Sequence, residues 1–404
     1  MKQKKLLLLG GLKYLIPVIE SAHKLGYYVI TCDYIPDNIA HKYSDEYHNV
    51  SIIDKQAVLE LAKKLKVDGI MSFAVDPGVV TAAYVSEKLG LPTPPYESVR
   101  ILQNKKLFRE FLSENNFNVP KAEGYTDINE AISEVDKFQW PIIVKPTDSA
   151  GSKGVTKVEK KDQLKSAIKY AIINSLSGEF IIEEFIQQQG YSSDSDCFSI
   201  NNDLQFVTFS NQRFDSNVAN PYTPAAYTWP SSISESNQIE LKSELQRLIK
   251  ILHLGTSIYN IEVREGLDGK SYIMEVSPRG GGNRLSEIVY LSTGFNIIEY
   301  AIQAAMGEKL KSIKQLPYNG HWAEIILHSD RDATFSSLYI SDKMKGNVYE
   351  TDLWVKKGDK INNFRGANDA IGTLILKFKD KESLESALCN QDKWLLIKSK
   401  NKIK

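Results

Sequence analysis

The sequence predicts an α/β (α+β) protein that begins with a doubly wound parallel sheet and ends in a β-rich segment. Three observations predict this class. Short apolar runs alternate with helical patterns over residues 1–95, as they do in parallel sheets. Pairs of alternating, strand-like runs flank a loop in two central segments, residues 142–158 and 259–277. Strand patterns also dominate residues 311–404.

The first 95 residues predict strands and helices in alternation. Ligands of doubly wound sheets bind at the carboxyl ends of the strands, which draws attention to Asp33 and to Asp76 in the segment Phe73–Gly78. The pair Gly10-Gly11 lacks the G-x-G-x-x-G spacing, so a dinucleotide site is not indicated. The expected strands are Leu6–Leu9, Tyr28–Cys32 and Gly69–Phe73, and the expected helices are Tyr14–Leu25, Lys55–Leu65 and Val79–Leu89.

A proline-rich stretch, Leu91–Val99, predicts a linker after this first domain. We therefore expect domains at residues 1–96, 97–310 and 311–404, with a subdomain at about residues 120–186. The further expected helices are Lys105–Asn115, Gln163–Asn174, Glu240–Leu252, Ile297–Met306 and Lys381–Leu388, and the further expected strands include Phe180–Phe185, Trp322–His328 and Thr373–Phe378.

The composition excludes several classes of protein. The 404 residues carry a formal net charge of zero, so no global charge favours nucleic acid or an anionic membrane. Three scattered cysteines form neither a disulfide framework nor a metal motif, which predicts a reducing cytoplasm. The first apolar run, Leu6–Leu9, is too short for a signal peptide, and no run approaches the ~20 residues of a membrane span.

The stretch Ile142–Val158 combines an apolar strand, a loop of small residues and a second strand. Glycines let backbone N–H groups turn inward to form an anion nest, and Lys145 and Lys153 add positive charge, so the loop suits phosphate oxygens. It is no Walker A loop, because the G-x-x-x-x-G-K-[ST] spacing is absent. The alternative is a plain surface hairpin with a polar tip.

The strongest signal from the residues themselves lies in Tyr259–Asn283. Two alternating runs flank Asp268-Gly269, which predicts a two-residue hairpin turn and places Glu262 opposite Glu275. Two carboxylates at ~4 Å repel by roughly 4 kcal/mol at an effective dielectric constant of ~20. Protonation, a salt bridge to Arg279 or a divalent cation such as Mg²⁺ could compensate, unless the register slips and one glutamate faces solvent.

Taken together, these residues resemble the ATP-grasp superfamily, in particular its carboxylate–amine ligases, such as L-amino acid ligases, and also biotin carboxylase and the halves of the carbamoyl phosphate synthetase large chain. The resemblance covers nearly the whole chain and implies a central domain of two α+β subdomains clasping ATP. It implies that Lys105 and Lys145 bind the nucleotide and that the loop of Ser149, Gly151, Ser152 and Gly154 covers the phosphates. The implied adenine hinge is Glu183, Glu184 and Ile186, with backbone contacts at the last two.

The resemblance also implies a metal site and a charge-stabilising arginine. Glu262 and Glu275 match the ligands of Mg²⁺ (or Mn²⁺), and Arg279 matches the arginine that stabilises the transferring phosphoryl group. Two positions depart from the family pattern. Ser277 stands where the family often has an asparagine as a third metal ligand, and Asp194 is the candidate in place of a ribose-binding glutamate. Arg213 is either a cation near the γ-phosphate or part of a surface salt bridge.

For function, the resemblance implies an enzyme that activates a small carboxylate as an acyl phosphate and joins it to an amine. The expected substrate contacts are Asp76, Gly281, Gly282 and Asn283, where the glycines allow close approach of a carboxylate or simply form a sharp turn. The first alternative is an enzyme that activates bicarbonate, and the second is a non-catalytic ATP-binding regulator. Homodimers are frequent among such relatives, so a homodimer is a further expectation.

Overall fold

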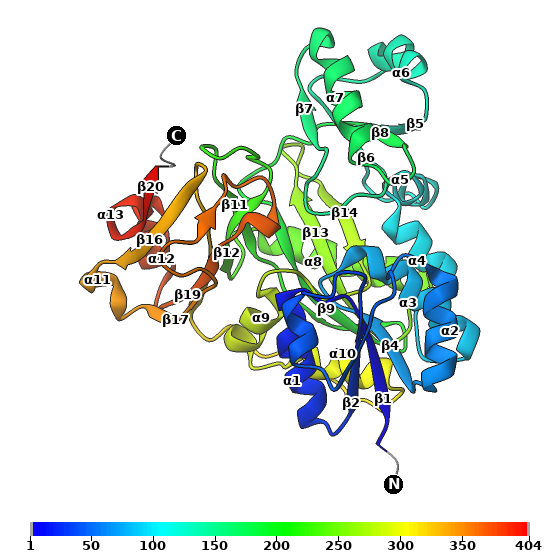
Figure 1. Cartoon of the computed structure of the whole chain (residues 1–404). Helices are drawn as coiled ribbons and strands as arrows, with labels where there is room; N and C mark the ends of the chain where they lie inside the picture. The colour runs from blue at the N-terminus through cyan, green and yellow to red at the C-terminus, as the bar shows by residue number, and fades with distance from the viewer. Residues whose placement is uncertain (1–2, 402–404) are drawn as a thin grey trace. The chain divides into compact units, whose positions relative to one another are not determined.

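The computed structural model describes residues 3–401 and divides into two compact units (Figure 1). The first unit takes in the described residues of Met1–Val119, together with Asp194–Thr208 and Ser234–Leu316. The second unit takes in Pro120–Ser193, Phe209–Ile233 and the described residues of Pro317–Lys404. Each unit is therefore assembled from three separate stretches of the chain, and the predicted subdomain at about residues 120–186 lies wholly in the second.

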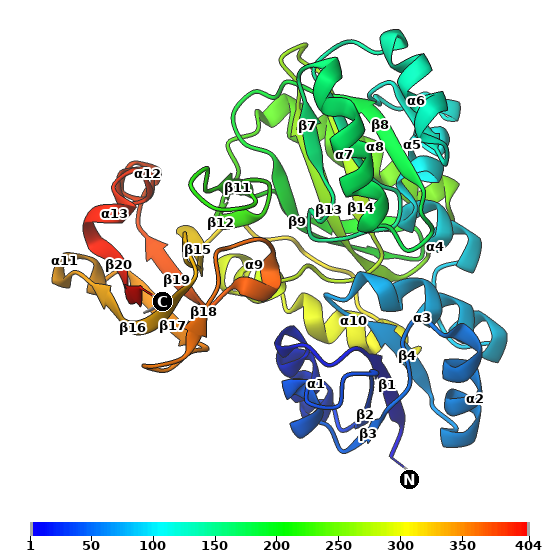
Figure 2. The same cartoon turned by 45° about the horizontal axis from the view of Figure 1, so that its top comes forward.

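A parallel sheet with strand order β3-β2-β1-β4 opens the first unit. Leu6 and Leu8 of β1 join one core, which includes Val18 of α1, whereas Leu7 and Leu9 join the core beneath α2 and α3. Figure 2 shows α1 on one side of this sheet and α2 and α3 on the other. The elements are β1 Lys5–Leu9, α1 Ile16–Lys24, β2 Tyr28–Cys32, β3 Glu46–His48, α2 Lys55–Leu65, β4 Gly69–Ser72 and α3 Asp76–Leu89, with 3₁₀ turns η1 Lys13–Leu15 and η2 Ile39–Lys42.

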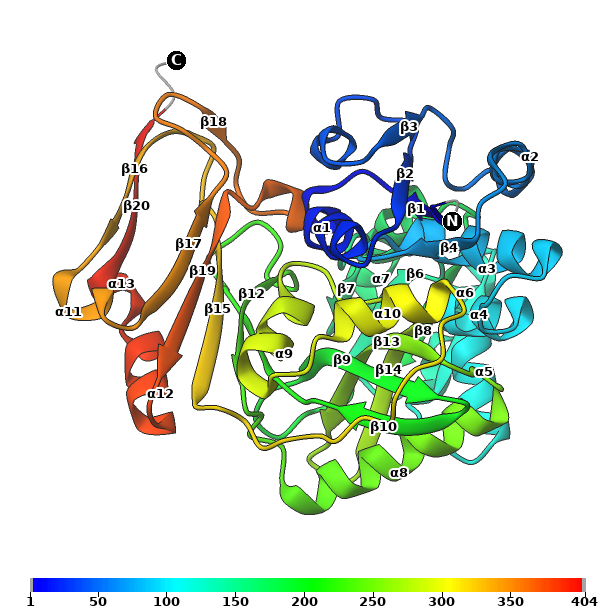
Figure 3. The same cartoon turned by 90° about the horizontal axis from the view of Figure 1, so that it is seen from below.

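A second sheet of the first unit carries the paired glutamates and has strand order β10-β9-β13-β14. Figure 3 shows α8 along one face of this sheet and α10 along the other. Both faces are thus covered, and strand residues such as Ile261 and Val263 are fully buried. The elements are α4 Tyr96–Gln103, α5 Lys105–Glu114, β9 Ser193–Ile200, β10 Asp203–Val207, α8 Glu235–Ile251, β13 Ser257–Glu265, β14 Ser271–Ser277, α9 Leu285–Thr293 and α10 Ile297–Ala305.

The second unit begins with a four-stranded sheet of order β5-β8-β6-β7. Ile142, Val144 and Ile182 of this sheet pack with Leu164 and Ile168 of α7 in one buried core. The apolar residues on one face of the sheet therefore pack against the apolar face of α7. The elements are β5 Ala122–Tyr125, α6 Ile128–Glu134, η3 Val135–Lys137, β6 Ile142–Pro146, β7 Thr156–Val158, α7 Lys161–Ile173 and β8 Phe180–Glu184.

The rest of the second unit is rich in strands, as predicted. A five-stranded sheet has the order β11-β12-β15-β19-β17, and a three-stranded sheet has the order β18-β16-β20. Ile325, Leu374 and Phe335 belong to one core shared by the two sheets. The elements are β11 Asn211–Phe214, β12 Pro224–Trp229, β15 His321–Leu327, β16 Ala333–Ile340, α11 Asp342–Lys345, β17 Val348–Leu353, β18 Lys360–Ile361, η4 Ala367–Asp369, β19 Gly372–Phe378, α12 Lys381–Cys389, α13 Gln391–Trp394 and β20 Leu395–Asn401.

The predicted fold class is confirmed, with local corrections: α8 begins at Glu235 rather than Glu240, and α9 was not expected. The predicted linker Leu91–Val99 is wrong in its second half, because α4 begins at Tyr96 and buries Val99. The strand β3 was not predicted, because Glu46–His48 carries no apolar run and pairs only at the edge of the sheet. None of the helices among residues 3–401 is long and apolar enough to cross a membrane.

Candidate active site

Glu262 of β13 and Glu275 of β14 lie directly opposite each other in the first unit, as predicted. The predicted two-residue turn is wrong. The N–H of Gly266 donates to Lys270 O over 2.8 Å, so the hairpin closes through three residues, Leu267–Gly269. Gly269 has φ +77°, the left-handed conformation that such three-residue loops need at their last position. A register shift between Glu262 and Val263 then restores the predicted pairing of the two glutamates.

Each glutamate has a cation beside it and keeps part of its surface open. Arg264 donates to Glu262 Oε1 over 3.0 Å, and Lys105 Nζ lies 3.8 Å from Glu275 Oε2. The glutamate side chains retain 28 % and 33 % of their exposure. In the part of the chain that the structure describes, no three His, Cys, Asp or Glu side chains group together to hold a metal ion. Two accessible carboxylates nevertheless fit Mg²⁺, which takes one or two protein carboxylates and fills its other positions with water and phosphate.

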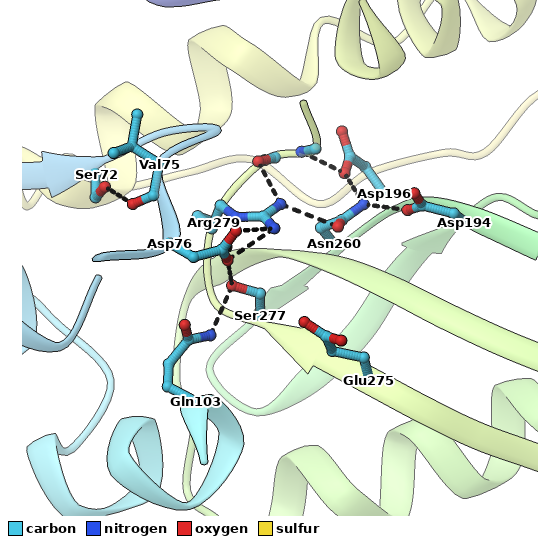
Figure 4. A network of polar contacts seen from close by, with 12 residues as sticks. Ser72, Val75, Asp76, Gln103, Asp194, Asp196, Asn260, Glu275, Ser277 and Arg279 are labelled. Atoms are coloured by element: carbon cyan, nitrogen blue, oxygen red, sulfur yellow. Dashed lines mark hydrogen bonds and ion pairs between the residues drawn. The ribbon is translucent and has the colours of Figure 1, made fainter. Parts of the chain in front are cut away.

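Arg279 is held on both sides by other side chains of the first unit (Figure 4). Its Nε and Nη2 donate to the two oxygens of Asp76 over 2.7 and 2.9 Å. Its Nη1 donates to Asn260 Oδ1 and to Gly280 O, both over 2.9 Å. Only 7 % of Arg279 is exposed. The guanidinium therefore has a single fixed direction.

Asp76 and Arg279 stabilise each other's charged forms. Burial alone would raise the pKa of Asp76, but the Arg279 charge and the hydrogen bonds from Arg279 and Ser277 outweigh it and hold this pKa below its ordinary value. Burial would lower the pKa of Arg279, and Asp76 outweighs that effect and raises it. Both oxygens of Asp76 accept hydrogen bonds from Arg279, so Asp76 supports the arginine, and its predicted substrate contact stays a prediction.

Ser277 lies beside this ion pair with its hydroxyl already in use. Its Oγ donates to Asp76 Oδ1 over 3.0 Å and accepts from Gln103 Nε2 over 2.7 Å. One lone pair of the oxygen remains, so a metal contact through Ser277 stays a prediction. Gln103 ends α4 and was not predicted as part of the site.

Two aspartates of β9 join the network through Asn260 (Figure 4). Asn260 Nδ2 lies 2.7 Å from Asp194 Oδ1 and 3.3 Å from Asp196 Oδ1. Asp196 also accepts hydrogen bonds from the N–H of Gly281, over 2.8 Å, and from the hydroxyl of Ser286. Asp194, predicted to bind ribose, thus lies in the network that holds Arg279, and its nucleotide contact stays a prediction.

Both aspartates resist ionisation. Burial, with the nearby charge of Glu262, raises the pKa of Asp194 to about 7. Burial also raises the pKa of Asp196 to about 6, although the hydrogen bonds from Ser286 and Gly281 oppose the shift. Carboxylates with perturbed pKa values gather at functional sites. Here both aspartates contact Asn260, which in turn contacts Arg279.

The glycines after Arg279 serve mainly close packing. A Cβ on Gly280 would lie 2.1 Å from Phe73 Cζ, and one on Gly281 would lie 2.4 Å from Leu285 Cδ1. A Cβ on Gly282 would meet nothing within 4 Å. The N–H of Gly281 donates to Asp196, so it is already engaged. Asn283 has φ +53° and accepts from the Tyr14 hydroxyl over 3.3 Å. Substrate contact at Gly281, Gly282 and Asn283 stays a prediction.

The predicted phosphate loop forms the tip of the β6–β7 hairpin in the second unit. Gly151, Ser152 and Gly154 have φ of +66°, +57° and +75°, which turns their N–H groups as an anion nest requires. Asp148 fixes the base of the loop by accepting from the N–H groups of Leu176 and Ser177. The Ser152 hydroxyl donates to Tyr222 O over 3.0 Å. The neighbouring Ser149 also belongs to this loop.

Lys145 lies at the end of β6 and forms an ion pair with Glu183 of β8, whose side chain is buried. Ile143 pairs with Glu183, so Lys145, two residues along, lies on the same face of the sheet. The N–H of Glu184 donates to Lys121 O over 2.9 Å and is engaged in the sheet. Ile186 follows the strand. Adenine contacts at Glu184 and Ile186 stay predictions.

Arg213 of β11 also lies in the second unit and pairs with Glu385 of α12 over 2.5 Å. Its guanidinium carbon stands 4.3 Å from the ring centroid of Tyr191. Only 13 % of the side chain is exposed, so this is a half-buried ion pair rather than a surface one. A role for Arg213 near the γ-phosphate stays a prediction.

Sequence reasoning missed Asn260, Asp196 and Gln103. Two of them carried a usable signal, because residues two apart on a strand share a face. Asn260 precedes Glu262 by two residues, and Asp196 follows Asp194 by two. Gln103 carried none, because its contact with Ser277 joins segments 174 residues apart.

Comparisons with known proteins show which family this chain resembles. Residues 138–287 match the family model of the ATP-grasp domain. The chain is 24 % identical over 270 residues to the carbamoyl phosphate synthase large chain of Thermoanaerobacter sp. (strain X514), covering 65 % of this chain and 24 % of that protein. The chain thus spans about a quarter of the length of such large chains.

Two further comparisons cover more of the matched protein. The chain is 24 % identical over 319 residues to a formate-dependent phosphoribosylglycinamide formyltransferase of Bacteroides thetaiotaomicron, covering 77 % of this chain and 79 % of that one. It also superimposes on the L-amino acid ligase from Bacillus licheniformis with a TM-score of 0.84 and 21 % identity, covering 99 % of this chain and 100 % of that one. At this identity the second comparison shows a shared fold.

Proposed function

We propose, on the premise that this chain carries an ATP-grasp domain, that the protein is an ATP-dependent ligase. It transfers the γ-phosphoryl group of ATP to a small carboxylate and joins the resulting acyl phosphate to an amine, releasing ADP and phosphate. The names of the matched formyltransferase and L-amino acid ligase support this choice of a small carboxylate as the activated acid and an amine as its acceptor.

One observation carries the proposal: Glu262 and Glu275 face each other beside a buried, fixed Arg279. A pair of carboxylates with exposed oxygens next to a rigid guanidinium suits a phosphoryl group in transfer, where charge spreads over several oxygens. A surface hairpin would have no reason to bury an arginine and two further aspartates beside such a pair.

The proposal gives each group a role. Mg²⁺ or Mn²⁺ bound by Glu262 and Glu275 would neutralise phosphate charge. Arg279 donates to the oxygens of the transferring group from a direction set by Asp76 and Asn260. Lys105 and Lys145 bind nucleotide phosphates, and the loop Ser149–Gly154 covers them and excludes water, which would hydrolyse the acyl phosphate. The amine nitrogen then attacks the acyl carbon, and the carbon–oxygen bond to phosphate breaks.

A second candidate, activation of bicarbonate, is favoured by the similarity to carbamoyl phosphate synthase large chains. The same glutamates, arginine and lysines would serve, because bicarbonate is also phosphorylated on a carboxyl oxygen. The two candidates differ only in the acid that the site accepts.

The test is ADP release from Mg²⁺-ATP across amino acids, small carboxylates and bicarbonate, each with and without hydroxylamine. ADP release together with a hydroxamate identifies an organic acid activated as its acyl phosphate. ADP release with bicarbonate alone would select the second candidate. Tight ATP binding without ADP release for any acid would contradict both and favour a non-catalytic ATP-binding protein.

A further inference from the structure

Asp196 is the most deeply buried acidic group in the network around Arg279. It has no exposed surface, yet its pKa of about 6 leaves it largely ionised at neutral pH. A buried carboxylate is costly unless hydrogen bonds satisfy it, and Asp196 accepts three. Their donors are Asn260 Nδ2, the N–H of Gly281 and the hydroxyl of Ser286.

Two of these donors lead directly to Arg279. Asn260 Nδ2 lies 2.7 Å from Asp194 Oδ1, 3.2 Å from Ser195 O and 3.3 Å from Asp196 Oδ1, and these three acceptors of β9 fix the orientation of the amide. Its oxygen therefore points the other way and accepts from Arg279 Nη1 over 2.9 Å. If the amide turned over, its NH₂ group would face the guanidinium, so Asp194, Asp196 and the Ser195 carbonyl together select the orientation that binds Arg279.

Besides Asn260, the donors to Asp196 are Gly281 and Ser286, which hold the segment that follows the arginine. Gly280 O accepts from Arg279 Nη1 over 2.9 Å, and the next residue, Gly281, donates its N–H to Asp196. Ser286 lies in the first turn of α9, so its hydroxyl fastens the start of that helix to the same carboxylate. Asp196 thereby contacts the groups that carry both acceptors of Nη1: the amide of Asn260, which it shares with Asp194 and Ser195, and the loop that carries the carbonyl of Gly280.

We propose that Asp196 is a positioning residue for Arg279, acting through Asn260 and the loop Gly280–Gly282. Asp76 binds one edge of the guanidinium, and the groups that Asp196 holds bind the other. The inference rests on the proposed function for its catalytic consequence, since Arg279 is taken there to contact the transferring phosphoryl group. Its structural part, the control of Arg279 by Asp196, stands apart from the identity of the substrates.

The test compares Asp196→Asn with Ser286→Ala, a control that removes one partner of Asp196 without touching Asn260 or Gly281. With the acid that the wild-type enzyme activates, Asp196→Asn is expected to lower kcat at least ten-fold and leave the KM for ATP within two-fold. Ser286→Ala is expected to keep kcat within three-fold. Equal losses in both variants, in proportion to the unfolded fraction, would mean that Asp196 only stabilises the fold.

A double-mutant cycle separates a role through Arg279 from any other. In an Arg279→Ala background, Asp196→Asn should change kcat less than two-fold further, because the group it positions is gone. Losses that multiply in the double variant would overturn the proposal.

A readout without substrates separates this inference from the proposed function. Protein labelled with ¹⁵N-arginine gives an Arg279 Nη1–H signal, assigned by its loss in Arg279→Ala. Asp196→Asn should shift this signal and speed its exchange with solvent, and Ser286→Ala should not. An unchanged signal would overturn the control of Arg279, whereas a shifted signal in an enzyme inactive toward every acid would leave it standing and reject only the ligase.

Discussion

At the scale of single residues, Arg279 is a directed donor rather than a free cation. Asp76 neutralises its charge through two hydrogen bonds, and Asn260 and Gly280 take the remaining edge. Four of its five N–H groups are thus engaged, and one Nη2 hydrogen is left for a ligand. Such a group gains its catalytic value from fixed geometry, which needs no reorganisation during the reaction.

Replacing Asp76 with asparagine should be strongly destabilising. The change leaves a buried guanidinium without its counter-charge, and breaking one side of a buried ion pair costs about 3–5 kcal/mol. We expect a lower thermal midpoint for the first unit and a lower kcat, with ATP affinity retained. Glu60→Gln, at an exposed pair with Lys63, is the control and should change the midpoint little. A midpoint unchanged in Asp76→Asn would contradict the importance of the pair.

Asp194 makes the stability of the folded protein depend on pH, and the sign of this dependence follows from its raised pKa. The folded value of about 7 lies above the ordinary value of 3.8, so between pH 4 and 7 the folded state holds a proton that the unfolded state has lost. Asp194 therefore costs stability progressively as the pH rises through this window, and the cost is constant above pH 7. The thermal midpoint of Asp194→Asn, relative to wild type, should rise from pH 4 to 7 and then level off. A difference independent of pH would contradict the raised pKa.

At the scale of elements, the hairpin β13–β14 places two candidate side chains by alternation and leads directly to a third. Glu275, Ser277 and Arg279 follow at intervals of two, and the first two lie on β14. The chain then leaves the strand through the segment Gly280–Gly282, which lets Phe73 pack against the backbone. Arg279 thus stands at the junction of a rigid strand and a closely packed loop.

A matched pair of glycine substitutions tests this junction. Gly280→Ala places a methyl group 2.1 Å from Phe73 Cζ, and overpacking of this kind costs about 1–3 kcal/mol and displaces the backbone that holds Arg279. We expect a lower thermal midpoint and a lower kcat. Gly282→Ala meets nothing within 4 Å, so its midpoint should stay near that of wild type. If Gly282 contacts the acid substrate, its alanine variant should raise only the KM for that acid.

A further substitution, in Phe73, tests whether the contact with Phe73 causes the loss of stability in Gly280→Ala. Phe73→Leu combined with Gly280→Ala should recover part of the lost stability, because the shorter side chain withdraws the atom that the new methyl group meets. A double variant no more stable than Gly280→Ala would mean that the loss has another origin.

The same hairpin shows what a sequence can and cannot predict. The pairing of Glu262 with Glu275 was predictable, because alternation assigns faces and the turn signal sets the approximate register. The three-residue loop and the compensating shift were not, because Gly269 fits either kind of turn. The partners of Arg279 were not predictable either, since Asp76 lies 203 residues away and only the folded chain brings it near.

At the scale of the whole molecule, the candidate groups are divided between the two units. The first carries Glu262, Glu275 and Arg279, and the second carries Lys145 and the loop Ser149–Gly154. The family model, residues 138–287, likewise draws on both. The predicted metal ligands therefore lie in the first unit and the predicted phosphate loop lies in the second.

Nucleotide binding should therefore depend on the divalent cation. A ligand present at 100 times its Kd stabilises a protein by about 2.7 kcal/mol, so saturating ADP with Mg²⁺ should raise the thermal midpoint by several degrees. With EDTA in place of Mg²⁺ the rise should be smaller, because the phosphates then approach Glu262 and Glu275 without a cation between them. Glu275→Gln should remove the difference between the two conditions, while Glu60→Gln, an exposed control on α2, should keep it. An equal rise with EDTA and with Mg²⁺ in the wild-type protein would mean that the paired glutamates do not hold the metal.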